Sequence, residues 1–195
     1  MKFLAIDTSG KSLAVVSYCD GKTQYSYLPE SQSKHSVVLM DAIENSLKRA
    51  KMKASDCDFF GVVVGPGSFT GIRIGIATVK GLCFACDKKA VAVTSLDCIA
   101  YAETGAKRLA LVDALHGNYY ASAYSEENGV DAQPAFLSGD EVNALIQKGY
   151  APRYPDGVDT AKGLLNAILA HKDKLIDAKE LTALYLRKSS AEENR

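Results

Sequence analysis

The sequence predicts an α/β protein built on a mixed β-sheet, with elements in the order β-β-β-α-β-α-β-α. Three observations predict this class. The chain opens with three strand-like segments joined by turn residues, and a continuous apolar run at residues 59–64 ends at Gly65-Pro66-Gly67. The start of the chain is then echoed near residue 108, which indicates a second lobe.

The opening segment has the pattern of an antiparallel meander. Strands are expected at Lys2–Asp7, at Leu13–Cys19 and at residues 23–28. Asp20-Gly21 is a strong hairpin signal between the second and third strands.

Helices and buried strands follow in alternation. Residues 33–51 and 70–86 are expected to be helical, residues 90–94 to form a strand, and a further helix to begin near Ser95. The apolar run at 59–64 fits a central strand covered on both faces.

The second half repeats the beginning of the first. Residues 108–113 match Lys2–Asp7 as a basic residue, four apolar residues and an aspartate, and a turn with Gly117 again precedes a strand at 119–124. We therefore expect two lobes, at residues 1–104 and 105–195, with the second reduced. Its helices are expected at residues 140–148 and from Asp159 or Thr160, and a polar tail at 189–195.

Composition limits the function. The 195 residues include 23 Lys plus Arg and 23 Asp plus Glu, so the formal charge is zero. This excludes a protein that holds nucleic acid by bulk charge, and any RNA contact must be local or shared. The amino end has no export signal and no run reaches the ~20 residues of a membrane span, so we expect a cytoplasmic protein without a membrane. The five cysteines are expected to be free thiols.

Two turns follow strands and end in small residues. Asp7-Thr8-Ser9-Gly10 suits nucleotide chemistry, because a carboxylate there can hold a metal-bound water, but it is also the pattern of a plain hairpin turn. Asp113 has the same two readings.

Gly65-Pro66-Gly67-Ser68-Phe69-Thr70-Gly71 is a glycine-rich junction between a strand and a helix. Such a junction indicates an anion-binding loop. Its spacing matches neither the dinucleotide fingerprint, nor a P-loop, nor a nucleophile elbow. The cofactor-binding candidates are Asp7, Thr8, Ser9, Gly67, Ser68 and Gly71.

The helix after this loop is apolar on most of its surface. Small residues recur at four-residue spacing, at Gly71 and Gly75 and then at Ala77, Gly81 and Ala85. Either a partner helix covers the side that its own sheet leaves free, or the second lobe does.

The sequence offers no self-sufficient catalytic set. Cys83 and Cys86 have the spacing of a redox or zinc half-site, but they lie at a helix carboxyl end, where the dipole disfavours thiolate. The three histidines, His35, His116 and His171, are scattered. We assign no catalytic residue and no metal ligand.

Residues 65–75 strongly resemble the TsaB family, also called YeaZ, bacterial partners in threonylcarbamoyladenosine formation on tRNA. The agreement covers nearly the whole chain in the family's order. It includes Asp7-Thr8-Ser9, His35-Ser36, Thr94-Ser95-Leu96, Asp113-Ala114 and Tyr185-Leu186-Arg187.

This resemblance implies a duplicated actin-like, or ribonuclease H-like, fold. It implies a non-catalytic paralogue of TsaD, the transferase that carries the metal. The family's catalytic members have two histidines one helical turn apart, whereas here Leu39 follows His35. Leu115 and Asn118 stand where more polar residues are expected, and the part after Gly149 is short for the family.

The resemblance also implies partners. We expect a scaffold subunit that binds TsaD, with a TsaE-like ATPase joining, tRNA reached only through the complex, and a homodimer in isolation. No cofactor is required by this chain, although ATP or ADP could occupy the assembled complex. The alternatives are an actin-like ATPase or phosphotransferase, and a glycoprotease-type metallopeptidase.

The family pairs through its first two helices. The expected contact residues lie on the two helices of the first lobe that precede and follow the apolar strand. They are Ser36, Met40, Ile43, Leu47, Arg73, Ile76, Ala77 and Lys80.

Overall fold

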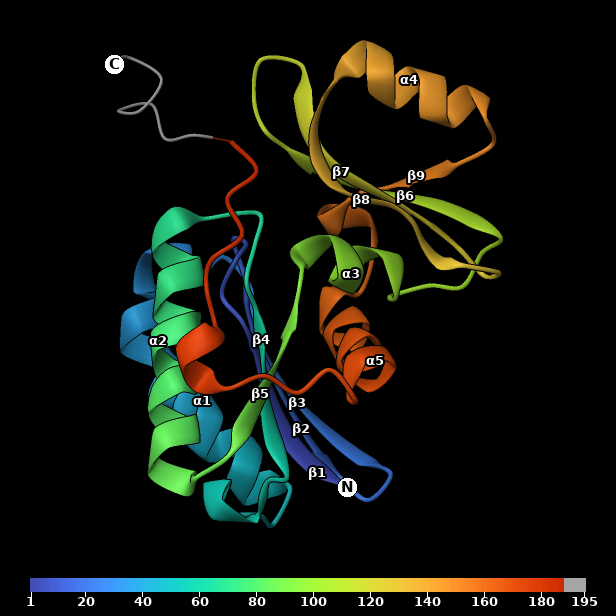
Figure 1. Ribbon diagram of the computed structural model, residues 1–195. Helices are drawn as coiled ribbons and strands as arrows, with labels where there is room; N and C mark the ends of the chain where they lie inside the picture. The colour runs from blue at the N-terminus through green and yellow to red at the C-terminus, as the bar shows by residue number, and fades with distance from the viewer. Residues whose placement is uncertain (188–195) are drawn as a thin grey trace.

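The computed structural model describes residues 1–187, apart from the side chain of Ser33, and consists of two β-sheets with helices on their faces (Figure 1). The predicted polar tail at 189–195 lies outside the described residues. The predicted mixed α/β class is confirmed.

The first sheet has the strand order β3-β2-β1-β4-β5. Its strands are β1 (Lys2–Asp7), β2 (Leu13–Cys19), β3 (Lys22–Leu28), β4 (Phe59–Val63) and β5 (Lys89–Val93). β1 pairs antiparallel with β2 and parallel with β4, which makes the sheet mixed. Asp20 and Gly21 both adopt positive φ, as a two-residue hairpin turn requires.

The second sheet repeats this topology in the order β8-β7-β6-β9. Its strands are β6 (Lys107–Asp113), β7 (Asn118–Ser125), β8 (Gly129–Ser138) and β9 (Ala151–Arg153). β6 pairs antiparallel with β7 and parallel with β9, just as β1 pairs with β2 and β4. The echo between the two halves of the sequence therefore corresponds to a repeated ββ unit with a parallel strand beside it.

Helices cover both faces of the first sheet (Figure 1). α1 (His35–Arg49) and α2 (Phe69–Cys86) lie on one face, and α3 (Ser95–Ala100) and α5 (Thr160–His171) lie on the other, between the sheets. α4 (Gly139–Gln147) packs on the far side of the second sheet. Short 3₁₀ turns occur at Gln32–Lys34, Ala54–Asp56, Pro155–Gly157 and Ala178–Glu180.

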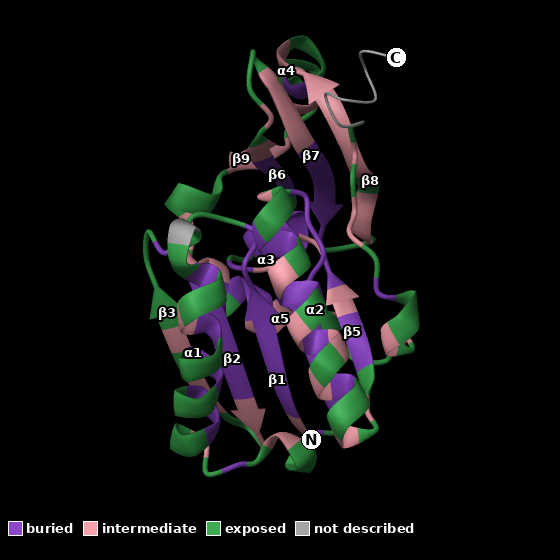
Figure 2. Ribbon diagram, turned by 90° about the vertical axis from the view of Figure 1, so that its left-hand side faces the viewer, coloured by how far each residue is buried: buried purple, intermediate pink, exposed green. Residues whose placement is uncertain are grey.

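β1 shows why both faces are covered. Leu4 and Ile6 belong to the apolar cluster under α1 and α2, whereas Phe3 and Ala5 belong to the cluster under α5. Because neighbouring strand residues point to opposite faces, an apolar run of this kind has to be buried on both sides. Figure 2 shows β1 as a buried strand.

Two strands of the second lobe were not predicted from the sequence. β8 carries Pro134 and register shifts against β7, so its alternation is broken. Pro152, which reads as a chain break, lies inside β9 at the edge of the sheet. Proline is tolerated there because one side of an edge strand needs no ladder hydrogen bond.

The chain returns to the first sheet after the second. Ile168 of α5 packs in the core beneath β1, and Leu181 lies in the core beneath α1 and α2. Ile176 exchanges backbone hydrogen bonds with Ala90 at 2.9 Å in both directions. The predicted boundary at residues 104 and 105 falls between α3 and β6, and the division into two domains stays a prediction.

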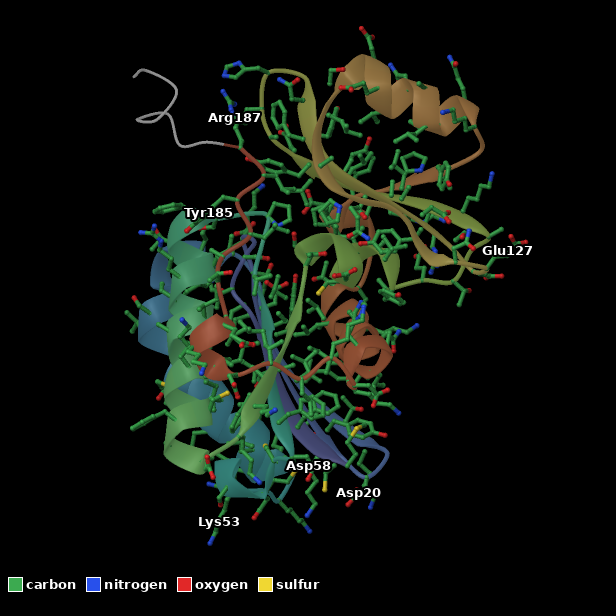
Figure 3. The ribbon with its side chains drawn as sticks, viewed as in Figure 1. Asp20, Lys53, Asp58, Glu127, Tyr185 and Arg187 are labelled. Atoms are coloured by element: carbon green, nitrogen blue, oxygen red, sulfur yellow. The ribbon has the colours of Figure 1, made fainter. Side chains whose placement is uncertain are left out.

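The last described residues run along α2 towards the second sheet (Figure 3). The Tyr185 ring stacks on Phe69 with centroids 5.2 Å apart, and Arg73 Nε donates to the Tyr185 hydroxyl at 3.0 Å. Two residues further on, the Arg187 guanidinium lies 5.5 Å from the Phe136 ring centroid in β8. This segment therefore links α2 to the second lobe.

α2 is long and apolar enough by length and composition to cross a membrane, with a mean hydropathy of 1.4 over 18 residues and one third of that stretch buried. A core helix passes the same test. α2 is the crossover between parallel strands β4 and β5, and it carries Arg73 and Lys80 along its length.

Candidate functional site

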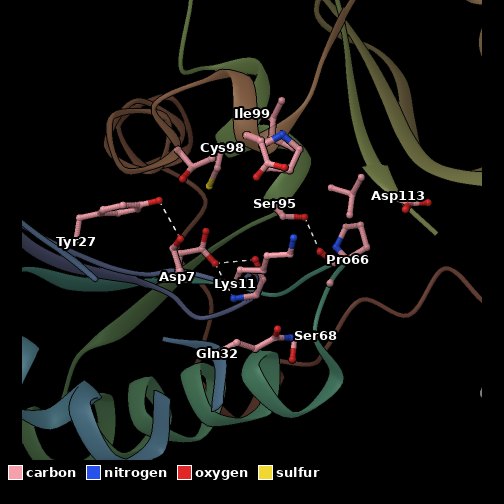
Figure 4. A pocket seen from close by; sticks show the side chains of 18 of the residues that line it. Asp7, Lys11, Tyr27, Gln32, Pro66, Ser68, Ser95, Cys98, Ile99 and Asp113 are labelled. Carbon is pink, nitrogen blue, oxygen red and sulfur yellow. Dashed lines mark hydrogen bonds between the residues drawn. The ribbon is translucent and has the colours of Figure 1, made fainter. Parts of the chain in front are cut away.

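A cavity of about 560 Å³ opens between the two lobes (Figure 4). Its lining comes from the turn after β1, the glycine-rich loop before α2, the start of α3 and the turn after β6. The polar residues that face it include Asp7, Ser9, Lys11, Ser68, Ser95 and Asp113. The two aspartates that the sequence singled out therefore face one space, although they are 106 positions apart.

Asp7 is held by its own turn. Its Oδ1 accepts hydrogen bonds from the Ser9 backbone N–H at 2.8 Å and from the Ser9 hydroxyl at 2.7 Å. Burial raises the pKa of Asp7, while these two hydrogen bonds and the nearby His35 act to lower it. The carboxyl group is thus a positioned but largely desolvated group.

The glycines of the loop make room for the turn after β1. A Cβ on Gly67 would overlap the Ser9 carbonyl oxygen, and one on Gly71 would overlap the Thr8 carbonyl oxygen. Two N–H groups of this loop are already engaged: Ser68 N–H donates to the Ser9 carbonyl at 2.7 Å, and Gly71 N–H donates to Ser68 Oγ at 3.2 Å. The glycines thus serve a close backbone approach, and the loop has fewer free donors than the sequence predicted.

The start of α3 closes the same side of the cavity. Ser95 Oγ donates to the Pro66 carbonyl at 2.6 Å, and the Gly65–Pro66 peptide bond is cis. Thr94 caps the helix, with its side chain and backbone N–H both bonded to Asp97.

The turn after β6 forms the opposite wall. Asp113 Oδ1 accepts the Leu115 backbone N–H at 2.8 Å, so this turn resembles the Asp7 turn in its local bonding. Leu115 and His116 have positive φ, which is costly for residues other than glycine. Leu115 is exposed and lines the cavity.

Four of the six predicted cofactor residues line the cavity, namely Asp7, Ser9, Gly67 and Ser68. Thr8 and Gly71 do not, because the Thr8 hydroxyl donates to the Gly71 carbonyl at 2.7 Å behind the loop. Lys11 and Ser95 line the cavity without having been predicted. The sequence does contain a signal for Ser95 as a cavity residue, since it lies between a strand and the helix that Thr94 caps.

The predicted contact residues divide into two groups. Ser36, Met40, Arg73 and Ala77 are exposed, and Lys80 is half-buried. Ile43, Leu47 and Ile76 instead belong to the apolar core beneath α1 and α2, so their assignment to a contact surface is corrected. The buried face of α1 runs through Leu39, Ala42, Ile43 and Ser46, about one position away from the face that the sequence suggested.

The cysteine pair lies at the carboxyl end of α2, as predicted. Cys83 is buried, and burial raises its pKa to about 11. Cys57 is buried as well, and burial raises its pKa to about 12. Within residues 1–187, no group of three or more His, Cys, Asp or Glu side chains could hold a metal ion.

Comparison with known proteins shows which family has this architecture. The family model described as TsaD, tRNA N6-adenosine threonylcarbamoyltransferase, matches residues 26–182. A solved structure from Pseudomonas aeruginosa, titled as a protein with similarity to peptidase YeaZ, superimposes with a TM-score of 0.80 at 25% identity, over 95% of this chain and 99% of that one.

Curated proteins with similar sequences indicate the same family. The protein of Bacillus subtilis named tRNA threonylcarbamoyladenosine biosynthesis protein TsaB is 33% identical over 132 residues, covering 67% of this chain and 58% of the relative. The Escherichia coli protein of the same name is 30% identical over 152 residues, covering 75% and 63%. The match thus spans about three fifths of the length of these relatives.

The fold, with two mixed β-sheets and a cavity between them, defines a protein of the actin-like class in the family of TsaD. Within that class, the chain belongs to the TsaB, or YeaZ, family.

Proposed function

We propose that this chain is a non-catalytic subunit that binds a TsaD-type transferase in the formation of N6-threonylcarbamoyladenosine beside the anticodon of tRNA. Family membership supports the pathway. The observation that carries the subunit role is an exposed apolar surface across the two helices on the outer face of the first sheet.

We call this the α1–α2 surface. Val37 is 73% exposed and Met40 57% exposed on α1, and Phe84 is 91% exposed on α2. Ala77, Gly81 and Ala85 are also exposed on α2. The two helices lie on the same face of the sheet with their outer sides open (Figures 1 and 2).

Large side chains beside small ones make this surface suited to another helix. Ala77, Gly81 and Ala85 repeat at four-residue spacing, so they form a shallow row that a partner backbone could approach. Burial of the Phe84 side chain by a partner would contribute about 1.5–3 kcal/mol to the free energy of binding. Large exposed apolar side chains on the open sides of two neighbouring helices suit a protein–protein contact site.

The state of the cleft supports a role without catalysis. Asp7 is engaged by Ser9, and the Ser68 and Gly71 N–H groups are occupied within the chain. The loop that would cradle a phosphate in an actin-like ATPase is therefore partly closed by the turn after β1.

The wider proposal follows the family. The isolated chain pairs with a second copy through the α1–α2 surface, and TsaD replaces that copy in the complex. A TsaE-like ATPase joins the assembly, in which ATP or ADP can bind, and tRNA is reached through the complex in the cytoplasm.

The test replaces Phe84 and measures binding to TsaD. Phe84→Ser is expected to weaken binding by about 10- to 100-fold by calorimetry, because the lost burial converts to that ratio. Ile146→Ser on α4 is the control, since it removes a large apolar side chain that is 36% exposed from a helix of the other lobe. Unchanged binding by the Phe84 variant, with a folded circular dichroism spectrum, would contradict the proposal.

One observation favours a second candidate, an actin-like ATPase or phosphotransferase. Asp7 and Asp113 face the same cavity from the two lobes, together with Lys11. Magnesium-dependent ATP turnover by the purified chain, lost in Asp7→Asn, would support this candidate over the subunit role.

A further inference from the structure

Three exposed side chains form a group at the amino end of α2. The Arg73 guanidinium carbon lies 3.7 Å from the centroid of the Phe69 ring, and the Tyr185 ring stacks on Phe69 with centroids 5.2 Å apart. Phe69 and Tyr185 are 49% and 48% exposed, and Arg73 is exposed as well. Figure 3 shows Tyr185 beside this end of α2. We call these three residues the Arg73 cluster.

The cluster holds the Arg73 guanidinium in one orientation. Its Nε donates to the Tyr185 hydroxyl at 3.0 Å, and the Phe69 ring covers one face of the planar group. The chain next to Tyr185 is itself fixed, because the Leu184 N–H donates to the Val64 carbonyl at 2.8 Å. An arginine that is already ordered loses less conformational entropy when it binds a partner.

The terminal nitrogens of Arg73 remain available for an anion. Among residues 1–187, Nη1 and Nη2 form no hydrogen bond and Arg73 forms no ion pair. Their N–H groups form a planar fork that matches the paired oxygens of a carboxylate or a phosphate. The cluster therefore presents an oriented, exposed cation that has no anionic partner within the described chain.

The position of the cluster favours a carboxylate on a protein. Arg73, Ala77 and Gly81 follow one another at four-residue spacing on the exposed side of α2. Phe84 lies on the same side, three residues further on. A surface that is cationic at one end and apolar beyond it suits an amphipathic helix with an acidic residue towards one end. RNA would leave the apolar part uncovered, and the chain has no net positive charge to attract phosphates.

We propose that the Arg73 cluster binds an aspartate or glutamate side chain of the TsaD-type partner, through an ion pair with Nη1 and Nη2 of Arg73. Tyr185 is the positioning residue that orients the guanidinium. This inference rests on the function proposed above, in which the partner covers the α1–α2 surface. The ion pair sets the register of the partner, with its acidic residue beside Phe69 and its apolar side chains against Phe84.

Calorimetric titration of the purified partner with variants of the full chain tests the proposal. Arg73→Gln is expected to weaken binding about tenfold or more, because it removes a charged donor pair. Lys162→Gln is the control, since it removes the same charge from an exposed position of α5, on the opposite face of the sheet. It is expected to leave binding unchanged. Unchanged binding by a folded Arg73→Gln variant, or an equal loss in both variants, would overturn the proposal.

Phe84→Ser separates this inference from the proposed function. Both Phe84→Ser and Arg73→Gln are expected to weaken binding to the partner. A loss of binding with Phe84→Ser but not with Arg73→Gln would overturn the inference and leave the subunit role standing. A loss with neither variant would overturn both.

The role of Tyr185 is tested by a double-mutant cycle. Tyr185→Phe keeps the stacked ring and removes the hydroxyl that accepts from Arg73. It is expected to weaken binding about two- to fivefold in the unaltered chain and to have no effect in the Arg73→Gln background. Equal losses in the two backgrounds would overturn the positioning role.

Salt dependence tests the ion pair itself. Added salt is expected to weaken binding of the unaltered chain more than binding of Arg73→Gln, because salt screens an attraction that the variant lacks. Equal salt dependence of the two proteins would overturn the ion pair.

Two other sources of the anion would overturn the proposal if found. Saturable binding of tRNA to the chain alone, lost in Arg73→Gln, would identify a phosphate. A second copy of the chain also exposes carboxylates, at Asp41 and Glu44 of α1. A homodimer that dissociates in Arg73→Gln by light scattering, while partner binding is unchanged, would identify one of these.

Discussion

Replacing a single helical glycine by alanine is expected to change stability in opposite directions at Gly163 and Gly81. Gly163 lies in α5, where a Cβ would overlap the Cys98 carbonyl oxygen of α3 and come within 3.2 Å of the Ala102 Cβ. Gly81 lies in α2, where a Cβ would meet nothing within 4 Å. The same chemical change is thus made in two helices with different surroundings.

The magnitudes follow from two competing effects. Alanine in place of glycine in a helix gains about 0.8–1 kcal/mol at either position. Overpacking costs about 1–3 kcal/mol, and we expect the upper end at Gly163 because a backbone carbonyl cannot rotate away. The expected net result is a loss of about 2 kcal/mol for Gly163→Ala and a gain of about 0.5–1 kcal/mol for Gly81→Ala.

Urea unfolding followed by circular dichroism checks both variants. It should be repeated at two protein concentrations, because Gly81 lies on the α1–α2 surface and self-association would alter its apparent stability. In thermal unfolding, a change of 2 kcal/mol corresponds to about 4–8 °C in a chain of this size. A neutral or stabilised Gly163→Ala variant would show that α3 and α5 are not in close backbone contact.

Three further predictions concern buried polar groups and thiols. Tyr124→Phe removes the hydroxyl that donates to Asp97 Oδ1 at 2.9 Å, so urea unfolding should show a loss of about 1–3 kcal/mol, and an unchanged midpoint would contradict that hydrogen bond. Burial lowers the pKa of His35 below its usual 6.5, against the opposing effects of Asp7 and the Thr8 backbone. The unfolded chain therefore binds more protons in that pH range, and stability should fall as the pH drops below about 6.5. His35→Gln should flatten this part of the stability profile, and an unaltered profile would assign the effect to another group. Alkylation of the native chain followed by mass spectrometry should label half-exposed Cys86 before Cys83, whose raised pKa of about 11 disfavours thiolate, and the reverse order would contradict the burial of Cys83.

The local sequence pattern was sufficient to predict most helices and strands of the first lobe. The Asp20-Gly21 hairpin, the apolar strand before Gly65 and the capped start of α3 each depend on neighbouring residues, so sequence reasoning could find them. The strands β8 and β9 were missed because β8 carries a bulge and a proline, and β9 has three residues around Pro152.

The candidate sites depended on contacts that no local pattern contains. The sequence indicated Asp7 and the glycine-rich loop. It could not show that the carbonyl groups of Ser9 and Thr8 occupy the space that a side chain at Gly67 or Gly71 would need. Likewise, the family resemblance suggested Ile43 as a contact residue, and helical periodicity could not correct this because a helix pattern alone does not say which stripe faces the sheet.

By itself, the sequence determined the class of fold, the repeated strand–aspartate–turn unit and the family. These follow from backbone preferences and from residue order, which act over a few positions. Only the tertiary structure decided which predicted residues share a cavity, which face of α1 and α2 remains open, and that His35 is buried close to Asp7. Those properties arise from packing between segments that are far apart in the chain. The position of a side chain there depends on the volume and polarity of distant residues, which the adjacent sequence does not specify.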